Sequence, residues 1–424
     1  MIDDFLKWFD KYGYPGWVAP SALLVVVLFI AYRIGFFTDL PRAFITIGPL
    51  FLVVLMAWLL SEEWMGYVIV RNFFHTPHVL LEIKMPSEIT QSPLAMETAL
   101  NGFFSTGDPA TPTDKYLGGK LNPQFSLEIA SLEGQIHFYI HTTVKWRNVI
   151  ESHLYAHYPG IEIVEVPDYV DMIQFDRKKM NLWGVTNTLQ KPDPYPIKTY
   201  VDYGLDEQTK EEFKIDPISS ILEYFGTLGK GEYAFFQLII RSHEDIAGYV
   251  KEGKEEIKKL VEEATGKEKG KENDFSVFKP ITKEVQTAIE RITRNIAKKP
   301  FDAGLRALYI ADLEHYDSTK PGGLPTMMRS FEDHMSNGFK PVFYTYKFKI
   351  SDFSGKKVEK NKKDLFAAYR WRSHLAPPYG RPKFVLSSEE IATVWHLPGL
   401  VSQTPTLTRI TSKRGEGPAN LPRG

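Results

Sequence analysis

The N-terminal part of the chain contains two long apolar segments. The second, Ala43 to Leu60, has eighteen residues without a charge. At about 1.5 Å per residue such a helix nearly spans the roughly 30 Å hydrocarbon core of a bilayer. The first, Trp17 to Tyr32, is shorter, but Arg33 can extend to the headgroups and four more apolar residues follow it. The pattern predicts a transmembrane hairpin over 17–76, with spans at about 17–37 and 43–60 and a connector after them.

Residues near the ends of the two spans are of the kinds that anchor helices at membrane interfaces. Tryptophan and tyrosine prefer the headgroup level, and arginine extends to it. We therefore expect interface anchors at Trp17, Tyr32, Arg33, Trp58 and Trp64.

Residues 1–16 are not a typical signal peptide, because the leader MIDDFLKWFDK has three acids against two lysines and no small-residue cleavage site follows it. We predict a short amphipathic helix at the interface instead. A hairpin places both chain ends on one side of the membrane. The positive-inside rule does not select that side, because two lysines outside the hairpin oppose two arginines near its turn.

From residue 77 the pattern changes to short alternating strands and amphipathic helices. Residues 78–85 alternate as a strand, 93–104 form a helical pattern, and two strands flank a turn at Glu133–Gly134. A helix over 144–158 and a strand over 161–166 complete the order β-α-β-β-α-β. This order predicts a ferredoxin-like α+β domain over 77–180.

Two further regions follow. Residues 181–355 predict a second, larger α+β domain, which we consider a decorated copy of the first, although no sequence repeat is visible. Residues 356–424 form a basic C-terminal segment. Within it Ser387 and Glu390 make an S-x-x-E capping box before a short helix, 388–396, and an extended linker follows.

Composition sets some limits on function. At 424 residues and 43% apolar content, the chain exceeds what a single hydrophobic core usually supports. Cysteine is absent, which excludes disulfides, thiolate metal sites and cysteine nucleophiles. The net charge is −1, but residues 340–424 hold sixteen Lys and Arg against six Asp and Glu. Such a segment is most often a solvated surface, and it can also face phosphates, acidic headgroups or an acidic partner.

The search for catalytic motifs returns weak matches only. The nearest phosphate-loop string, Gly266 to Lys271, is one spacer short and lies in a charged run. His153 with His157, and His137 with His141, have spacings that suit a shared metal, but no third ligand can be named. Neither a nucleophile elbow nor a dinucleotide fingerprint occurs. We therefore predict no catalytic, cofactor or metal site, and a protein that is not an enzyme. An unrecognised carboxylate or histidine site is a weaker option.

Several segments together resemble the membrane-anchored region that precedes the ATPase domain in bacterial type IV secretion and conjugative DNA-transfer coupling proteins, the HerA/FtsK-like class. The segments are PYPIKTY (194–200), 216–241, 298–314, FVLSSEEIATVWHLPG (384–399) and 129–163. In that family a linker and then the ATPase domain follow. Here the linker is represented by Thr404 through Pro422, without such a domain in the 424 residues.

The resemblance implies a non-catalytic membrane-anchoring and assembly component of a conjugative DNA-transfer system. We expect a bilayer, a homo-oligomer and a separately encoded HerA/FtsK-like ATPase as partners, a cytoplasmic soluble region, and DNA contact through the basic C-terminal segment. The alternative is a membrane-tethered scaffold or receptor unrelated to DNA. The residues that we expect to dock a partner or motor are Trp395, His396, Leu397, Pro398, Lys413 and Arg414.

Overall fold

The computed structural model describes residues 40–86, 89, 91–104, 111–173, 175–176, 178–206, 215–265, 281–345, 355–399 and 409–410. It divides into two compact units, Met1–Tyr67 and Val68–Gly424. The predicted interfacial helix (1–16) and first span (17–37) lie outside the described residues, and so do their anchors Trp17, Tyr32 and Arg33.

Helix α3 (Leu40–His75) contains the predicted second span and continues well beyond it. Its part from Phe51 to His75 is long and apolar enough to cross a membrane, and only 6% of its most apolar window is buried. Trp58 and Trp64 are 56% and 50% exposed. Large apolar side chains on one helix are unfavourable in water and favourable in lipid. The structure therefore has one candidate membrane span in its described part, and the predicted connector is helical.

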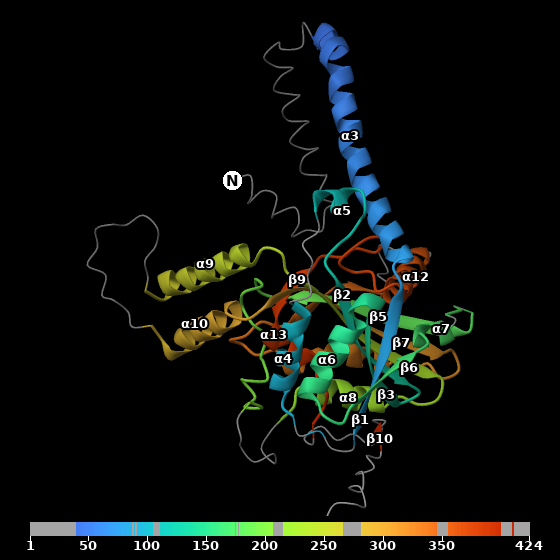
Figure 1. Cartoon of the computed structure of the whole chain (residues 1–424), viewed down its shortest axis with the longest axis vertical. Coiled ribbons are helices and arrows are strands. Elements are labelled where there is room, and N and C mark those ends of the chain that lie inside the picture. Colours follow the sequence, from blue (N-terminus) through green and yellow to red (C-terminus); the bar gives the residue numbers. More distant parts are fainter. Residues whose placement is uncertain are drawn as a thin grey trace, which may run out of the picture. The chain divides into compact units, whose positions relative to one another are not determined.

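The second unit is built on one mixed sheet with α-helices on both of its faces (Figure 1). The strand order is β10-β1-β3-β2-β6-β7-β5-β8, with β4 also paired to β1 and β9 to β7. The strands are β1 (His78–Pro86), β2 (Gln124–Leu132), β3 (Gln135–Thr143), β4 (Glu162–Val166), β5 (Met180–Leu189), β6 (Glu232–Ser242), β7 (Pro300–Asp312), β8 (Phe339–Tyr344), β9 (Phe384–Ser387) and β10 (Arg409–Ile410).

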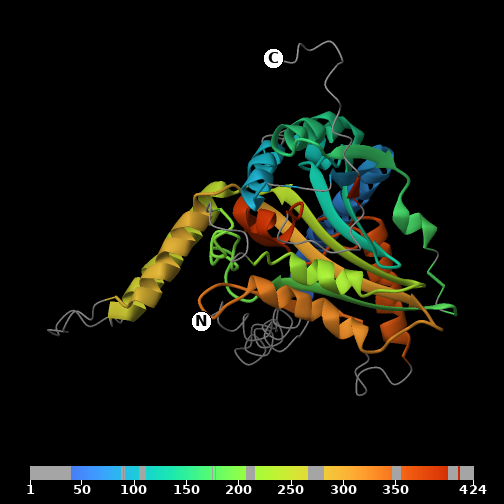
Figure 2. The ribbon, with the colours of Figure 1, turned by 90° about the horizontal axis from the view of Figure 1, so that it is seen from below.

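The helices differ in how they meet this sheet. One core cluster joins strand side chains to α4, α6, α8 and α13, and a second cluster joins the alternate strand side chains to α7 and α12. Helices α9 and α10 pair with each other and extend from the sheet (Figure 2). The helices are α4 (Pro93–Phe104), α5 (Pro112–Tyr116), α6 (Arg147–His157), α7 (Tyr169–Met172), α8 (Ser219–Gly226), α9 (Ile246–Thr265), α10 (Lys283–Ile296), α11 (Gly323–Thr326), α12 (Lys356–Arg370) and α13 (Ser388–Val394).

The sheet consists of two halves with the same strand order. In the first half the antiparallel order is β4-β1-β3-β2. In the second half it is β8-β5-β7-β6, again antiparallel throughout. The second strands of the two halves, β2 and β6, pair antiparallel and join the halves. The structure thus contains a repeat that the sequence does not display.

The halves differ most between their second and third strands. In the first half a two-residue turn, Glu133–Gly134, has φ of 54° and 89°. In the second half the helices α9 and α10 fill the corresponding place. A side chain on Gly134 would meet the carbonyl oxygen of Leu228 at 2.5 Å, so the turn requires glycine for both conformation and space.

The predicted boundaries at 180/181 and 355/356 do not separate compact units. Strands from both regions share one sheet, and β9 and α13 from the basic C-terminal segment complete the core. Residues 68–424 form one unit in consequence. The capping box that the sequence predicts is confirmed: the Ser387 side chain accepts from the Glu390 backbone, and the Glu390 side chain accepts from the Ser387 backbone.

A buried ion pair lies where the two halves meet. Glu128 of β2 stands opposite Gln237 of β6, and Gln237 Nε2 donates to Glu128 Oε1 at 2.8 Å. Arg372, just after α12, donates through Nε to Glu128 Oε1 at 3.0 Å and through Nη2 to Oε2 at 3.2 Å. Its guanidinium also binds Asp168, the N-cap of α7. Tyr169 Oη donates to Glu128 Oε2 at 2.8 Å.

Burial acts to raise the pKa of Glu128, but the attraction of Arg372 and hydrogen bonds from Arg372, Ser126 and Tyr169 lower it. The carboxylate is therefore charged, and the network satisfies both of its oxygens. The pair fastens α12 and α7 to the strand at the centre of the sheet.

We expect Arg372→Met to lower the free energy of unfolding at neutral pH by about 3–5 kcal/mol, because it leaves a buried carboxylate without its cation. Without Arg372, burial raises the folded-state pKa of Glu128 above its unfolded value. Folding then favours the protonated form, and the loss shrinks as pH falls toward 4. Denaturant unfolding in detergent at pH 7.5 and 5 measures both effects.

Arg370→Ala is the matched control. It removes an ion pair to Asp171 in which both side chains are about half exposed. We expect it to cost less than about 1 kcal/mol. An equal loss from Arg370→Ala and Arg372→Met would contradict a special role for the buried pair.

Candidate functional site

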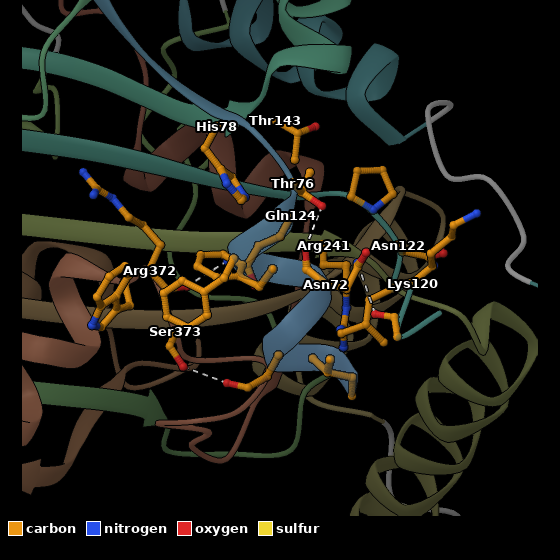
Figure 3. A pocket seen from close by; sticks show the side chains of 18 of the residues that line it. Asn72, Thr76, His78, Lys120, Asn122, Gln124, Thr143, Arg241, Arg372 and Ser373 are labelled. Carbon is orange, nitrogen blue, oxygen red and sulfur yellow. Dashed lines mark hydrogen bonds between the residues drawn. The ribbon is translucent and has the colours of Figure 1, made fainter. Parts of the chain in front are cut away.

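A cavity of about 600 Å³ lies in the second unit at the end of α3 (Figure 3). Its wall comes from the last turns of α3, the start of β1, the 119–124 segment, the end of β3 and the loop after α12. The volume is in the range of pockets that hold small ligands. It is the feature of the described residues that best qualifies as a ligand site.

The 119–124 segment lies against α3 through a side-chain hydrogen bond and a close backbone approach. Asn72 Nδ2 donates to the carbonyl of Gly119 at 3.3 Å. Gly119 has φ of 62°, and a side chain there would meet the carbonyl oxygen of Val68 at 2.3 Å. Only glycine therefore allows this close approach. The wall is fixed by the helix rather than by the cavity's contents.

The charged side chains of the cavity wall are mainly cations. Lys120, Lys145, Arg241 and Arg372 line it, and Asp114 is the one acid of the described lining. Lys120 pairs with Asp114 at 2.9 Å. Cations therefore outnumber acids in the wall itself, while the carboxylates that pair with Arg241 and Arg372 lie outside it.

Arg241 is held from behind by Asp302. Its Nη2 lies 3.0 Å from Asp302 Oδ2, and His243 and Lys383 bind the same carboxylate. Burial acts to raise the pKa of Asp302, but these three partners together lower it to about 2. The buried Nε of Arg241 has no hydrogen-bond partner among the described residues. This atom has almost no accessible surface, so it is an internal unsatisfied donor and not a contact for a ligand in the cavity.

Aromatic side chains form another part of the wall. Phe73, Phe74, Trp146 and Trp371 line the cavity, and Phe74 meets Trp371 edge-on with ring centroids 4.8 Å apart. Phe74 is 53% exposed and Trp371 37%. The cavity thus combines cations with an exposed apolar border, an arrangement that suits an amphiphilic anion.

Two histidines stack at the wall. The rings of His78 and His141 lie 5.1 Å apart and nearly parallel. Burial and the positive charge of Arg372 lower the pKa of His141 well below its usual value. Burial is also the main cause that lowers the pKa of His78, and Arg372 adds to it. Both rings are neutral at pH 7 in consequence.

Four of the residues that the sequence analysis proposed for docking have a packing role in the structure. Trp395, His396, Leu397 and Pro398 are buried, because α13 lies in the core and carries them inside. Trp395 Nε1 donates to the carbonyl of Glu128 at 3.3 Å, and His396 Nε2 lies 3.1 Å from Asp216. In this fold these side chains serve the core, and their part in docking a partner stays a prediction. Lys413 and Arg414 lie outside the described residues.

The histidine pairs do not converge with other ligands. Among the described residues, groups of three or more His, Asp or Glu side chains placed to hold a metal are absent. His137 binds Glu82 at 2.7 Å, and the His153 ring packs against Gly102. His141 instead faces the cavity.

Sequence reasoning missed the cavity because its wall comes from five separate segments. Asn72, Lys120, Arg241 and Arg372 belong to no common motif. One local signal existed: a Gly–Gly–Lys turn, 118–120, in a loop rich in glycine, proline and threonine. Such a turn indicates close backbone approach, but it does not say what it approaches.

Comparison with known proteins gives a family but no activity. A family model described as "Domain of unknown function (DUF8128)" matches residues 76–409. The matched region begins at the last residues before β1 and includes the sheet and most of the cavity wall. No curated protein matches the chain.

We expect His141→Gln to reduce the loss of stability in acid. In the folded state the pKa of His141 is lowered, so below about pH 6.5 the unfolded chain takes up a proton that the folded chain does not. The stability contribution of this group is therefore lost as pH falls below 6.5. Melting temperatures at pH 7.5 and 5 should differ less for the variant than for the wild type.

The exposed His334 supplies the control, and His334→Gln should follow the wild-type pH dependence. Identical pH profiles for His141→Gln and the wild type would show that His141 does not titrate as its surroundings indicate.

Proposed function

The chain belongs to the DUF8128 family, whose description names no activity, and we propose that it is a non-catalytic membrane-anchoring and assembly component of a conjugative DNA-transfer system. In this proposal it works with a separate HerA/FtsK-like ATPase and forms homo-oligomers. The observation that carries the anchoring role is α3, whose exposed apolar surface continues in one helix to the first strand of the sheet. The resemblance described above supplies the system.

The two-span hairpin is part of the proposal. Its second helix corresponds to α3, and the apolar pattern over 17–37 supports its first. Both ends of the chain then lie on one side of the membrane, and the resemblance favours the cytoplasm for the soluble region.

We also propose that the two halves of the sheet are ferredoxin-like units. The order β4-β1-β3-β2, with helices after the first and third strands, supports this for 77–180. The order β8-β5-β7-β6 supports it for the second half. The edge pairing of β2 with β6 would then join two such units into one platform.

The segments that carry the resemblance are neighbours in space. β6 pairs with β7, and β7 pairs with β9. The backbone N–H of Ile197 donates to Glu390 Oε1 at 3.0 Å, and Thr199 Oγ1 donates to Glu389 at 2.6 Å. PYPIKTY and FVLSSEEIATVWHLPG thus meet through buried polar contacts. These contacts support one packed framework for the segments of the second half that carry the resemblance. The proposed DNA-transfer system rests on that support.

The orientation can be tested by single-cysteine labelling, because the natural chain has no cysteine. Lys254 is exposed on α9. We expect Lys254→Cys to react with a membrane-impermeant maleimide only after the cells are permeabilised. Asp39→Cys, between the two proposed spans, should react in intact cells.

Each labelling outcome has a distinct meaning. Labelling of Lys254→Cys in intact cells would overturn the cytoplasmic orientation. Labelling of both positions only after permeabilisation would show that α3 does not cross the membrane between them. The cysteine-free wild type is the control for background reaction.

The assembly role is tested by affinity capture of the full chain from its native membranes after chemical cross-linking. We expect additional copies of the chain and a HerA/FtsK-like ATPase to be enriched over an untagged control. A nuclease-treated sample separates contact through DNA from direct contact. A monomeric chain without such an ATPase would favour a scaffold or receptor unrelated to DNA.

A further inference from the structure

The cavity at the end of α3 has a wall that favours one class of ligand. We propose that it binds the headgroup of an anionic phospholipid from the membrane that α3 enters. The inference rests on the membrane anchoring in the proposed function and not on DNA transfer. The second unit would then hold a binding site for a lipid of the membrane in which the chain is anchored.

The charge of the wall favours an anion. Four cations and one acid line the cavity in its described part, and the acid is paired with Lys120. The carboxylates that hold Arg241 and Arg372 lie behind them and not in the cavity. Partly buried charges are screened less by water and salt than surface charges. A phosphate diester carries one negative charge, which suits a wall in which cations outnumber acids.

The border of the cavity favours a lipid over a soluble anion. Phe74 and Trp371 of the wall are exposed, and so is Val144, which lies between the wall residues Thr143 and Lys145 in the sequence. Exposed apolar side chains gathered at one place on a protein mark an interaction surface. Tryptophan and tyrosine prefer the headgroup level of a bilayer. A free phosphate would leave this border in water.

Helix α12 has a basic surface, and the helix ends at the cavity wall. Its exposed cations include Lys357, Lys360 and Lys363, and the helix is followed directly by Trp371 of the wall. Basic clusters beside a membrane helix attract anionic lipids over about a Debye length. They raise the local concentration of the headgroup that the cavity would bind.

The test uses the full chain in neutral detergent, with phosphatidylglycerol, phosphatidylcholine and inorganic phosphate as three separate probes. We expect phosphatidylglycerol to raise the melting temperature in a saturable manner. Phosphatidylcholine and inorganic phosphate should leave it unchanged. The double variant Lys120→Gln/Lys145→Gln should bind phosphatidylglycerol about 30-fold more weakly, the loss expected for two cations at an anionic surface.

The matched control is Lys251→Gln/Lys254→Gln on α9, which removes two exposed lysines far from the cavity in sequence and outside its wall. It should bind like the wild type. Trp371→Ala, which keeps every charge, should also weaken binding, since it removes the apolar border. Folding of each variant is checked by its melting temperature without lipid.

Three results would overturn the inference: an equal shift with phosphatidylcholine, an equal shift with inorganic phosphate, or unchanged binding by the double variant. The second result would assign the cavity to a soluble anion. Failure of the anchoring proposal is a separate observation, because it would appear as release of the chain from membranes by salt or alkali. A membrane-embedded chain that ignores phosphatidylglycerol would refute the lipid site alone.

Discussion

The buried contact between Glu128 and Arg372 organises the second unit. A carboxylate at the centre of a sheet is tolerated only when its charge is matched and its oxygens are bonded. Arg372, Ser126, Tyr169 and Gln237 meet that requirement from four different segments. One of these segments is β6, in the other half of the sheet. The need to balance one buried charge therefore fixes how the two halves of the sheet and the helices α7 and α12 fit together.

The same contact fixes the cavity. Arg372 reaches inward to Glu128, and its neighbours Trp371 and Ser373 stay in the wall. Gln124 Nε2 donates to the carbonyl of Arg372 at 2.8 Å and ties the 119–124 segment to the same loop. Arg372 also holds down the pKa of the stacked histidines. Arg372 thus has two roles: it balances the buried charge of Glu128, and it sets part of the electrostatic environment of the cavity.

Local sequence patterns predicted the elements well. The strand over 78–85, the turn at Glu133–Gly134 and the capping box at Ser387 are all in the structure, because alternation, turn chemistry and caps act over a few residues. The joining of β2 to β6 was not predictable in this way. It depends on pairing between segments more than a hundred residues apart, and both strands are buried on both faces.

The burial of Trp395 to Pro398 was not predictable from the sequence for a related reason. Its cause lies in neighbours from other parts of the chain: Phe138 packs on Trp395, and α4 packs on α13. Burial of a helix this short is set by what covers it, and that information lies elsewhere in the chain.

The basic C-terminal segment illustrates how structure changes the meaning of a charge count. In sequence, residues 340–424 are a positive region that could face any phosphate. In the structure much of this charge is on α12, and Phe74 of α3 contacts Trp371 at the end of α12. A charge count alone describes the segment as a basic tail. Helix α12, however, packs on the sheet through Leu365 and Tyr369, so its cations have a fixed place on the folded unit.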